Sequence, residues 1–202
     1  MLRFLIILFS YLNIFQTILA DDRLPPIPEN QITFEQQDAI NEMLEERGYA
    51  PRGPWIPLLR SPEVHKRARA MGDYLRYESS LIQNLREFLI LLTARYWTQN
   101  YIWYAHYPIA LEVGINNETV EDIMNNKKPD NMTPAESTLY DFFLELNDEK
   151  FISEETYSDM ISKFGEKGLI DAIGIIGYYT LLAMTMNAAQ TNVPEGDVPI
   201  LK

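Results

Sequence analysis

Residues 81–97 read LIQNLREFLILLTARYW, and they decide the fold. Every residue from Phe88 to Leu92 is apolar, so a helix here is apolar on nearly all of its faces. A helix of that kind belongs in a protein core rather than at a surface. Glu87 stands at the entrance to the apolar run, where burying a carboxylate is costly unless it has a partner. We therefore expect a central helix with a buried, paired glutamate at its start.

The surrounding sequence predicts further helices and no strands. Ser61-Pro62-Glu63 is typical of a helix start, with a serine cap, a proline at the first position and an acid in the first turn. Thr133 and Glu136 have the spacing of a capping box. No segment shows sustained period-two alternation, so the prediction is an all-α, single-domain multi-helix bundle. The expected helices cover residues 31–47, 62–77, 81–97, 101–113, 116–125, 134–146, a segment opening at 153, and 169–190.

Composition excludes several functions. The chain has 202 residues, a formal net charge of -12 and no cysteine. An acidic chain lacks the basic surface that nucleic acid requires, so no nucleic-acid partner is expected. Without cysteine there are no disulfides, thiolate zinc sites or thiol redox reactions. The apolar fraction of 47% is ordinary for a globular protein.

The N-terminus resembles a targeting segment. Arg3 is followed by an uncharged, mainly apolar stretch that ends at Ala20, which is the pattern of a signal peptide over residues 1–20. An uncleaved membrane anchor is the alternative, but the stretch is short for the roughly 20 residues that span a bilayer. We expect an exported protein, periplasmic or secreted. The sequons at Asn117 and Asn131 matter only in a eukaryotic secretory pathway.

The expected organisation continues from this segment to the C-terminus. Residues 21–60 form an N-terminal arm, a helix and a Pro-rich loop at 50–57, residues 61–190 a helical domain, and residues 191–202 a tail. No charge occurs from Ala172 to Val193, which is long enough to suggest a transmembrane helix. Polar residues interrupt this stretch, so a core or subunit-interface helix without stable membrane insertion is the favoured interpretation.

His106 is the main candidate for chemistry. The chain has only two histidines, and neither belongs to a metal-binding spacing, so no metal or other cofactor is expected. His106 lies within an apolar stripe and should face the interior, where it needs a hydrogen-bond partner. Pro108 should kink the helix or delay its start, leaving the Tyr104 carbonyl unpaired. Glu87 is the second candidate, and a purely structural His–Glu pair is the alternative.

Two blocks around these residues resemble the carboxymuconolactone decarboxylase family, which includes the alkyl hydroperoxidase D-type proteins. The blocks are Leu85-Arg86-Glu87-Phe88-Leu89-Ile90-Leu91 and Tyr101-Ile102-Trp103-Tyr104-Ala105-His106, followed by Ala110 and Gly114. The resemblance covers roughly residues 61–188. It implies an all-helical protein that assembles as homotrimers or homohexamers, with sites between helices near subunit contacts.

The resemblance also assigns roles to individual positions. Glu87 matches the glutamate and His106 the histidine of a proton relay, whereas the two relay cysteines fall on Gln99 and Ile102. Thiol peroxidase chemistry is therefore excluded. In many cysteine-free members a glutamate occupies the position of Ile102, and this chain lacks that carboxylate as well.

The placement of basic residues indicates where an anion would bind. Residues 52–95 contain more basic than acidic residues, against the acidic balance of the chain, and Arg86 and Arg95 are the expected carboxylate anchors. Tyr101, Trp103 and Tyr107 are expected to wall the pocket. One hypothesis is a cofactor-free lyase for a small carboxylated lactone or related enolisable acid, with His106 as proton donor and Glu87 orienting it. The other is a non-catalytic exported binding or assembly protein. Both predict a homo-oligomer, and a small organic acid is the expected ligand.

Overall fold

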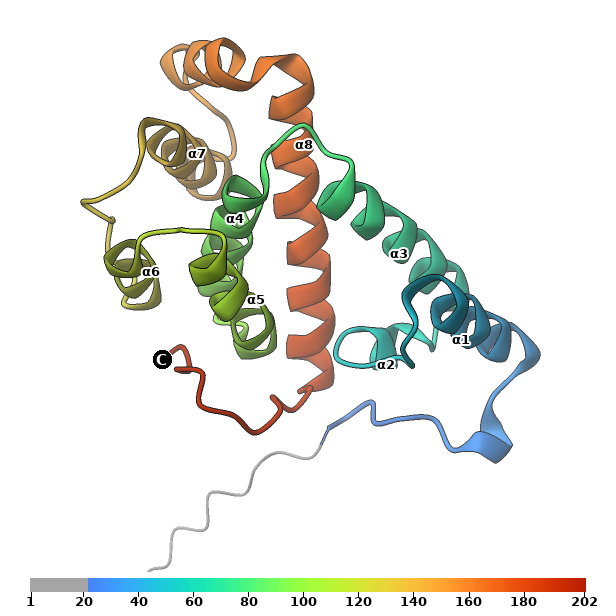
Figure 1. Cartoon of the computed structure of the whole chain (residues 1–202). Helices are drawn as coiled ribbons and strands as arrows, with labels where there is room; N and C mark the ends of the chain where they lie inside the picture. Colours follow the sequence, from blue (N-terminus) through green and yellow to red (C-terminus); the bar gives the residue numbers. More distant parts are fainter. Residues whose placement is uncertain (1–21) are drawn as a thin grey trace, which may run out of the picture.

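The computed structural model describes residues 22–202, which form an all-α bundle around one long helix (Figure 1). No strand occurs in this range, as predicted. The helices are α1 (Phe34–Arg47), α2 (Trp55–Leu58), α3 (Pro62–Tyr77), α4 (Gln83–Tyr96), α5 (Asn100–Glu112), α6 (Asn117–Met124), α7 (Pro134–Leu144) and α8 (Glu154–Ala189), with short η1 (Glu29–Gln31) and η2 (Glu145–Glu149). The expected signal peptide at 1–20 lies outside the described residues.

Helix α8 organises the molecule. Its second half packs against α2, α3 and α4, while α7 also contacts it, so α1–α3 lie on one side of α8 and α4–α7 on the other. Gly165 has φ 67° and ψ 177°, which breaks the helix and turns its direction near the top of Figure 1. The two separate helices expected after residue 153 therefore meet at this glycine, whose missing Cβ permits the positive φ.

Helix α4 is the core helix that its sequence predicts. It contacts α5, α6, α7 and α8, and its residues from Glu87 to Ala94 are all buried. Phe88, Leu89 and Leu91 are fully buried. An apolar run with no polar face is stable here because other helices surround it.

Several helix ends follow the sequence signals. The capping box at Thr133 and Glu136 is present, and α3 begins at Pro62. Gly48 ends α1 with a left-handed backbone, which a glycine adopts without strain. The hydroxyl of Ser61, however, makes no capping hydrogen bond, so that part of the predicted helix start is wrong.

Two local expectations are corrected. The Pro-rich segment 50–57 is expected as a loop, but Trp55–Leu58 forms α2, and its Pro57 is buried. Helix α5 begins at Asn100 and runs through Pro108, so it does not start late. The proline leaves the Tyr104 carbonyl without its helical N–H donor, as its ring nitrogen carries no hydrogen.

Helix α8 is also the one described helix that is long and apolar enough to cross a membrane by length and composition. Within its most apolar window, 56% of the residues are buried inside the molecule. More than half of this window is therefore enclosed by other parts of the described chain.

Candidate functional site

A buried hydrogen bond between two polar side chains joins the two central helices. Glu87 of α4 and His106 of α5 are 5% and 7% exposed, and Glu87 Oε2 lies 2.6 Å from His106 Nδ1. The Tyr179 ring of α8 meets the imidazole edge-on, with ring centroids 5.1 Å apart. When Nδ1 carries the proton, it donates to the carboxylate, so Glu87 sets both the ring orientation and the tautomer. The expected pairing of these two residues is thus present.

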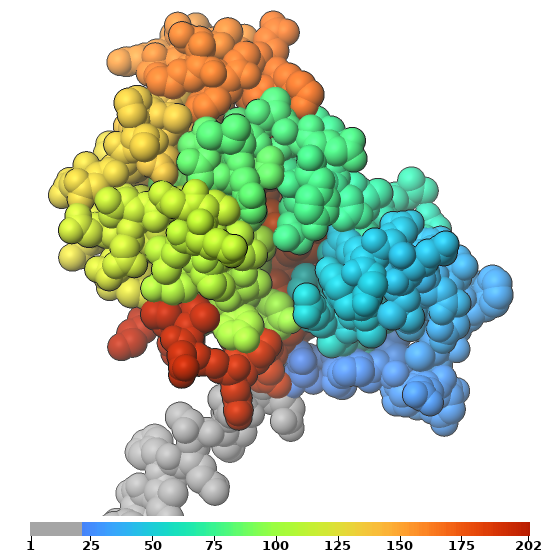
Figure 2. Space-filling model, in the orientation of Figure 1, coloured from blue at the N-terminus to red at the C-terminus, as the bar shows by residue number. Residues whose placement is uncertain are grey.

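His106 also lines a pocket of about 580 Å³. Because Nδ1 is engaged by Glu87, Nε2 is the nitrogen free to meet a ligand. The pocket lies between α5, α8 and the segments from α1 to α3; in Figure 2, α8 is visible at the bottom of the hollow between residues of α5 and those of α2 and α3. Its walls are Arg47, Tyr49, Arg52, Pro54, Trp55, Arg76, Tyr101, Ile102, Tyr104, Ala105, His106, Tyr178, Tyr179, Leu182, Met186 and Pro194.

The pocket is electropositive. Three arginines, Arg47, Arg52 and Arg76, line it together with His106, and no carboxylate does so among the described residues. The chain as a whole carries a formal net charge of -12, so the charge of this lining is opposite to that of the whole chain. Guanidinium groups suit carboxylates because they donate two parallel hydrogen bonds. The pocket can therefore receive a small anion.

The three arginines differ in their availability. Arg47 donates to Asp73 Oδ1 at 2.6 Å and to the Arg69 carbonyl, and it lies over the Trp55 ring. Arg52 is exposed and lies over the Tyr49 ring at 4.3 Å, without a hydrogen bond to residues 22–202. Two guanidiniums, Arg52 and Arg76, are thus free to bind a ligand, whereas Arg47 serves mainly to hold the wall together.

Arg76 has a particular position. It forms no ion pair or hydrogen bond within the described chain, and it lines both this pocket and a second one of about 180 Å³ on the Glu87 side. Burial alone would lower the pKa of Arg76, but Tyr179, Tyr77 and Glu87 more than offset that effect and raise it. Arg76 therefore stays charged beside the relay at every physiological pH.

Tyrosine hydroxyls supply the remaining polar groups. Burial raises the pKa of Tyr178 to about 12 and that of Tyr179 well above its usual range. Both phenols therefore stay neutral and can donate hydrogen bonds near neutral pH. Tyr178 fits against α3 because Gly72 has no Cβ at the place where the phenol lies.

The structure does not bring the two predicted anchors to this pocket. Arg86 donates to the Leu81 carbonyl and lines the smaller pocket with Glu87, while Arg95 donates to the Lys202 carbonyl on the other end of α4. Arg86 and Arg95 were predicted as anchors because they lie close to Glu87 in the sequence. Packing of α1–α3 against α8 instead supplies Arg47, Arg52 and Arg76, of which Arg52 and Arg76 belong to the basic segment 52–95.

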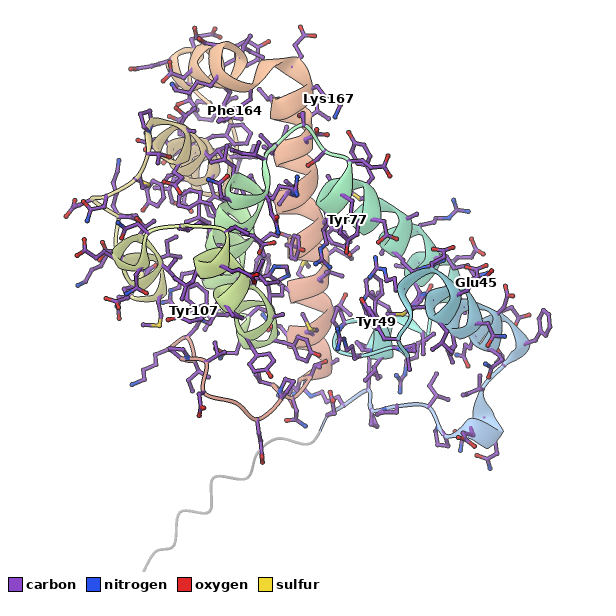
Figure 3. The ribbon with its side chains drawn as sticks, in the orientation of Figure 1. Glu45, Tyr49, Tyr77, Tyr107, Phe164 and Lys167 are labelled. Atoms are coloured by element: carbon purple, nitrogen blue, oxygen red, sulfur yellow. The ribbon has the colours of Figure 1, made fainter. Side chains whose placement is uncertain are left out.

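Only one of the three aromatic residues that were predicted to wall the pocket does so. Tyr101 lines the pocket, but Trp103 is fully buried in the core and Tyr107 packs against it, with ring centroids 5.8 Å apart. Figure 3 shows Tyr107 on the α6 side of α5, away from Tyr49, which lies on the pocket side near α1 and α2. Helical periodicity explains the division, since 101 and 105 share a face that 103 and 107 do not.

The two positions that match the relay cysteines have separate functions here. Gln99 caps α5 by accepting from the Tyr101 and Ile102 N–H groups, and its amide donates to Asn187 of α8. Ile102 lines the pocket with an apolar side chain. Residues 22–202 contain no cluster of three His, Asp or Glu side chains that could hold a metal ion.

Solved structures with the same fold include alkylhydroperoxidase-type proteins. A peroxidase-related protein from Ralstonia eutropha JMP134 with an alkylhydroperoxidase AhpD core has a TM-score of 0.67 and 18% identity, covering 86% of this chain and 92% of that one. A peroxidase-related protein from Silicibacter sp. TM1040 has a TM-score of 0.66 and 16% identity, covering 88% and 94%. The debrominase Bmp8, in a complex with 2,3,4-tribromopyrrole, has a TM-score of 0.62 and 14% identity, covering 85% and 91%.

These similarities define the fold class. The chain has the alkyl hydroperoxidase D-like fold, in agreement with the resemblance carried by the Glu87 and His106 blocks. No protein-family model and no curated protein matches the sequence.

Proposed function

We propose that this protein is a cofactor-free acid–base catalyst, a lyase that decarboxylates a small carboxylated lactone or related enolisable acid. One observation carries the proposal: His106, oriented through Nδ1 by Glu87, faces a pocket that contains three arginines and no carboxylate among its described lining residues. A histidine in this setting can transfer a proton to a bound anion. The free guanidinium of Arg76 supplies the opposite charge.

The residues can divide the reaction between them. The bond to the leaving carboxylate breaks, its electron pair moves into the conjugated carbonyl to give a dienolate, and carbon dioxide leaves. The imidazolium of His106 gives its Nε2 proton to carbon and becomes neutral imidazole, while Glu87 stabilises the imidazolium beforehand. Arg76 holds a carboxylate that remains on the product, and solvent returns the proton to Nε2 after product release.

The proposal is tested by carbon dioxide release from 4-carboxymuconolactone. We expect turnover by the wild-type chain, a loss of at least 100-fold in His106→Gln, and a loss of 10-fold or more in Glu87→Gln, because a positioned acid contributes about 10²–10⁴ in rate. Arg67→Gln is the matched control, since Arg67 lies on the same helix as Arg76 but is exposed and pairs only with Glu63. Wild-type release no greater than that of His106→Gln would contradict the proposal.

A non-catalytic binding protein is the second candidate function. Ile102 favours it, because this position is apolar where many cysteine-free relatives of the resembled family have a glutamate. In that case the pocket retains an anion without converting it. Saturable binding of an organic acid together with no His106-dependent turnover would favour this second function.

A further inference from the structure

The lining of the His106 pocket is restricted to a few chemical types. Of its described residues, six are aromatic besides His106 and three are arginines; the others are apolar, with no amide, aliphatic hydroxyl or carboxylate side chain. A polyhydroxylated ligand would find tyrosine hydroxyls and guanidiniums there, but no carboxylate or amide oxygen to accept from its hydroxyl groups. A cationic ligand would meet only positive charge. The lining therefore suits an anion with a flat, mostly apolar body.

The aromatic side chains are held in fixed positions by close backbone approaches. A Cβ at Gly53 would lie 2.6 Å from the Tyr101 ring, so the glycine backbone packs directly on that ring. In the same way, a Cβ at Gly72 would overlap the Tyr178 hydroxyl oxygen, so the Gly72 backbone packs directly on the Tyr178 phenol. Tyr179 is further fixed by edge-on contacts with both Tyr178 and His106, each with centroids 5.1 Å apart. Rings fixed before binding lose little conformational entropy when a ligand arrives.

The free cations lie at different depths of the pocket. Arg76 is half-buried beside Tyr179, near the relay, whereas Arg52 is exposed beside Tyr49. A carboxylate that pairs with Arg76 gains from partial desolvation, while one on Arg52 stays in contact with water and gains less. The inner guanidinium is thus the better anchor, and it places the body of the ligand against the tyrosine rings.

We propose that the preferred ligand is a small aromatic carboxylate, with its carboxylate on Arg76 and its ring against the tyrosines beside His106. Aromatic pairs gain roughly 2- to 12-fold in affinity beyond the burial of area, an advantage that a saturated ring does not share. The inference goes beyond the proposed function and does not rest on it, because it concerns only which anion the pocket prefers and not what His106 does to that anion. Binding can therefore be measured independently of turnover.

The test compares three probes of similar size by isothermal titration calorimetry on the full chain. Benzoate carries both the ring and the charge, cyclohexanecarboxylate has the charge without the aromatic ring, and benzamide has the ring without the charge. We expect benzoate to bind with a Kd at least several-fold lower than that of cyclohexanecarboxylate and at least 10-fold lower than that of benzamide. Trp55 is the one tryptophan among the pocket's described lining residues, so the part of the total tryptophan fluorescence that benzoate quenches should saturate at the same benzoate concentration.

Two variants of pocket residues and one control variant locate the binding site. Arg76→Gln should raise the benzoate Kd at least 10-fold, whereas the exposed Arg67→Gln should leave it unchanged. Tyr101→Leu should reduce the preference for benzoate over cyclohexanecarboxylate while retaining carboxylate binding. Urea unfolding checks that each variant is folded. Equal affinity for benzoate and cyclohexanecarboxylate, or an unchanged Kd in a folded Arg76→Gln, would overturn the proposal.

The outcomes also separate this inference from the proposed function. Tight, Arg76-dependent benzoate binding without His106-dependent carbon dioxide release supports the ligand class and contradicts the lyase. Turnover of 4-carboxymuconolactone with no preference for benzoate supports the lyase and contradicts the aromatic ligand class.

Discussion

The buried position of His65 predicts that the folded protein loses stability in weak acid. The side chain is fully buried in α3, packs edge-on against Trp55 at 5.2 Å, and leaves both ring nitrogens without a partner in the described structure. Burial lowers its pKa to about 4; Arg69, Arg47 and Lys66 add to this effect, and only Glu42 opposes it. His65 is therefore neutral in the folded protein throughout the range where a solvated histidine takes up a proton.

The sign and size of the effect follow from proton linkage. Between pH 6.5 and about 4 the unfolded chain binds a proton at His65 and the folded chain does not, so the stability is complete above 6.5 and falls as the pH decreases through that window. At ~1.4 kcal/mol for each tenfold change, the difference between the two pKa values amounts to ~3 kcal/mol. Most of a marginal stability of 5–15 kcal/mol would survive, but the change is large enough to measure.

Urea unfolding of wild type and His65→Leu at pH 7, 5.5 and 4.5 checks this prediction. The free energy of unfolding of the wild type should fall by ~2 kcal/mol more than that of the variant between pH 7 and 4.5. Any constant offset from the substitution cancels in that comparison. Asp171, whose pKa is held at about 2 mainly by Lys167 and Ser80 against the effect of burial, acts at lower pH and does not interfere. Parallel losses in the two proteins would refute the reasoning.

Three further predictions concern packing, assembly and the relay. Gly72→Ala should lower the free energy of unfolding in urea by ~1–3 kcal/mol, because its Cβ would overlap the Tyr178 phenol. Gly177→Ala should raise it by up to ~1 kcal/mol, because a Cβ at this position of α8 meets open space. Leu181 lies on the exposed face of α8, which we propose joins copies of the chain. Leu181→Asp should therefore reduce the mass measured by light scattering, and a monomeric wild type would contradict this assembly. Ile102→Glu should raise carbon dioxide release at least several-fold, and no gain would show that this carboxylate is not what limits the site.

The sequence predicted the helices well where local chemistry determines them. The Thr133 box, the proline at the start of α3 and the glycine after α1 act within one helical turn, so their residue types suffice. The short α2 was missed because three prolines suggest a loop, yet Pro57 occupies a helical turn that the core stabilises. Tertiary contacts outweigh local preference there.

The candidate site was predicted only in part, for a related reason. Glu87 and His106 could be paired because each was a costly polar group on an apolar helix, and two such groups in one core satisfy each other. Arg47 and Arg76 gave no such signal, because each lies on a mostly polar helix where an arginine usually faces water. Their approach to His106 depends on how α1 and α3 pack on α8, which helical periodicity does not specify.

The same packing explains how an acidic protein can still attract an anion. Many of its carboxylates lie on outer surfaces or are paired with cations there, such as Asp38 and Glu42 with Lys66, whereas Arg76 faces inward without a counter-ion in the described chain. Surface charges are screened within about 8 Å at physiological salt, so the overall negative charge has little effect inside the pocket. Over that short range the unpaired guanidinium of Arg76 and the Glu87–His106 pair determine the electrostatic attraction that an anion meets. Binding of an anionic probe should therefore depend strongly on Arg76 and only weakly on the net charge of the chain.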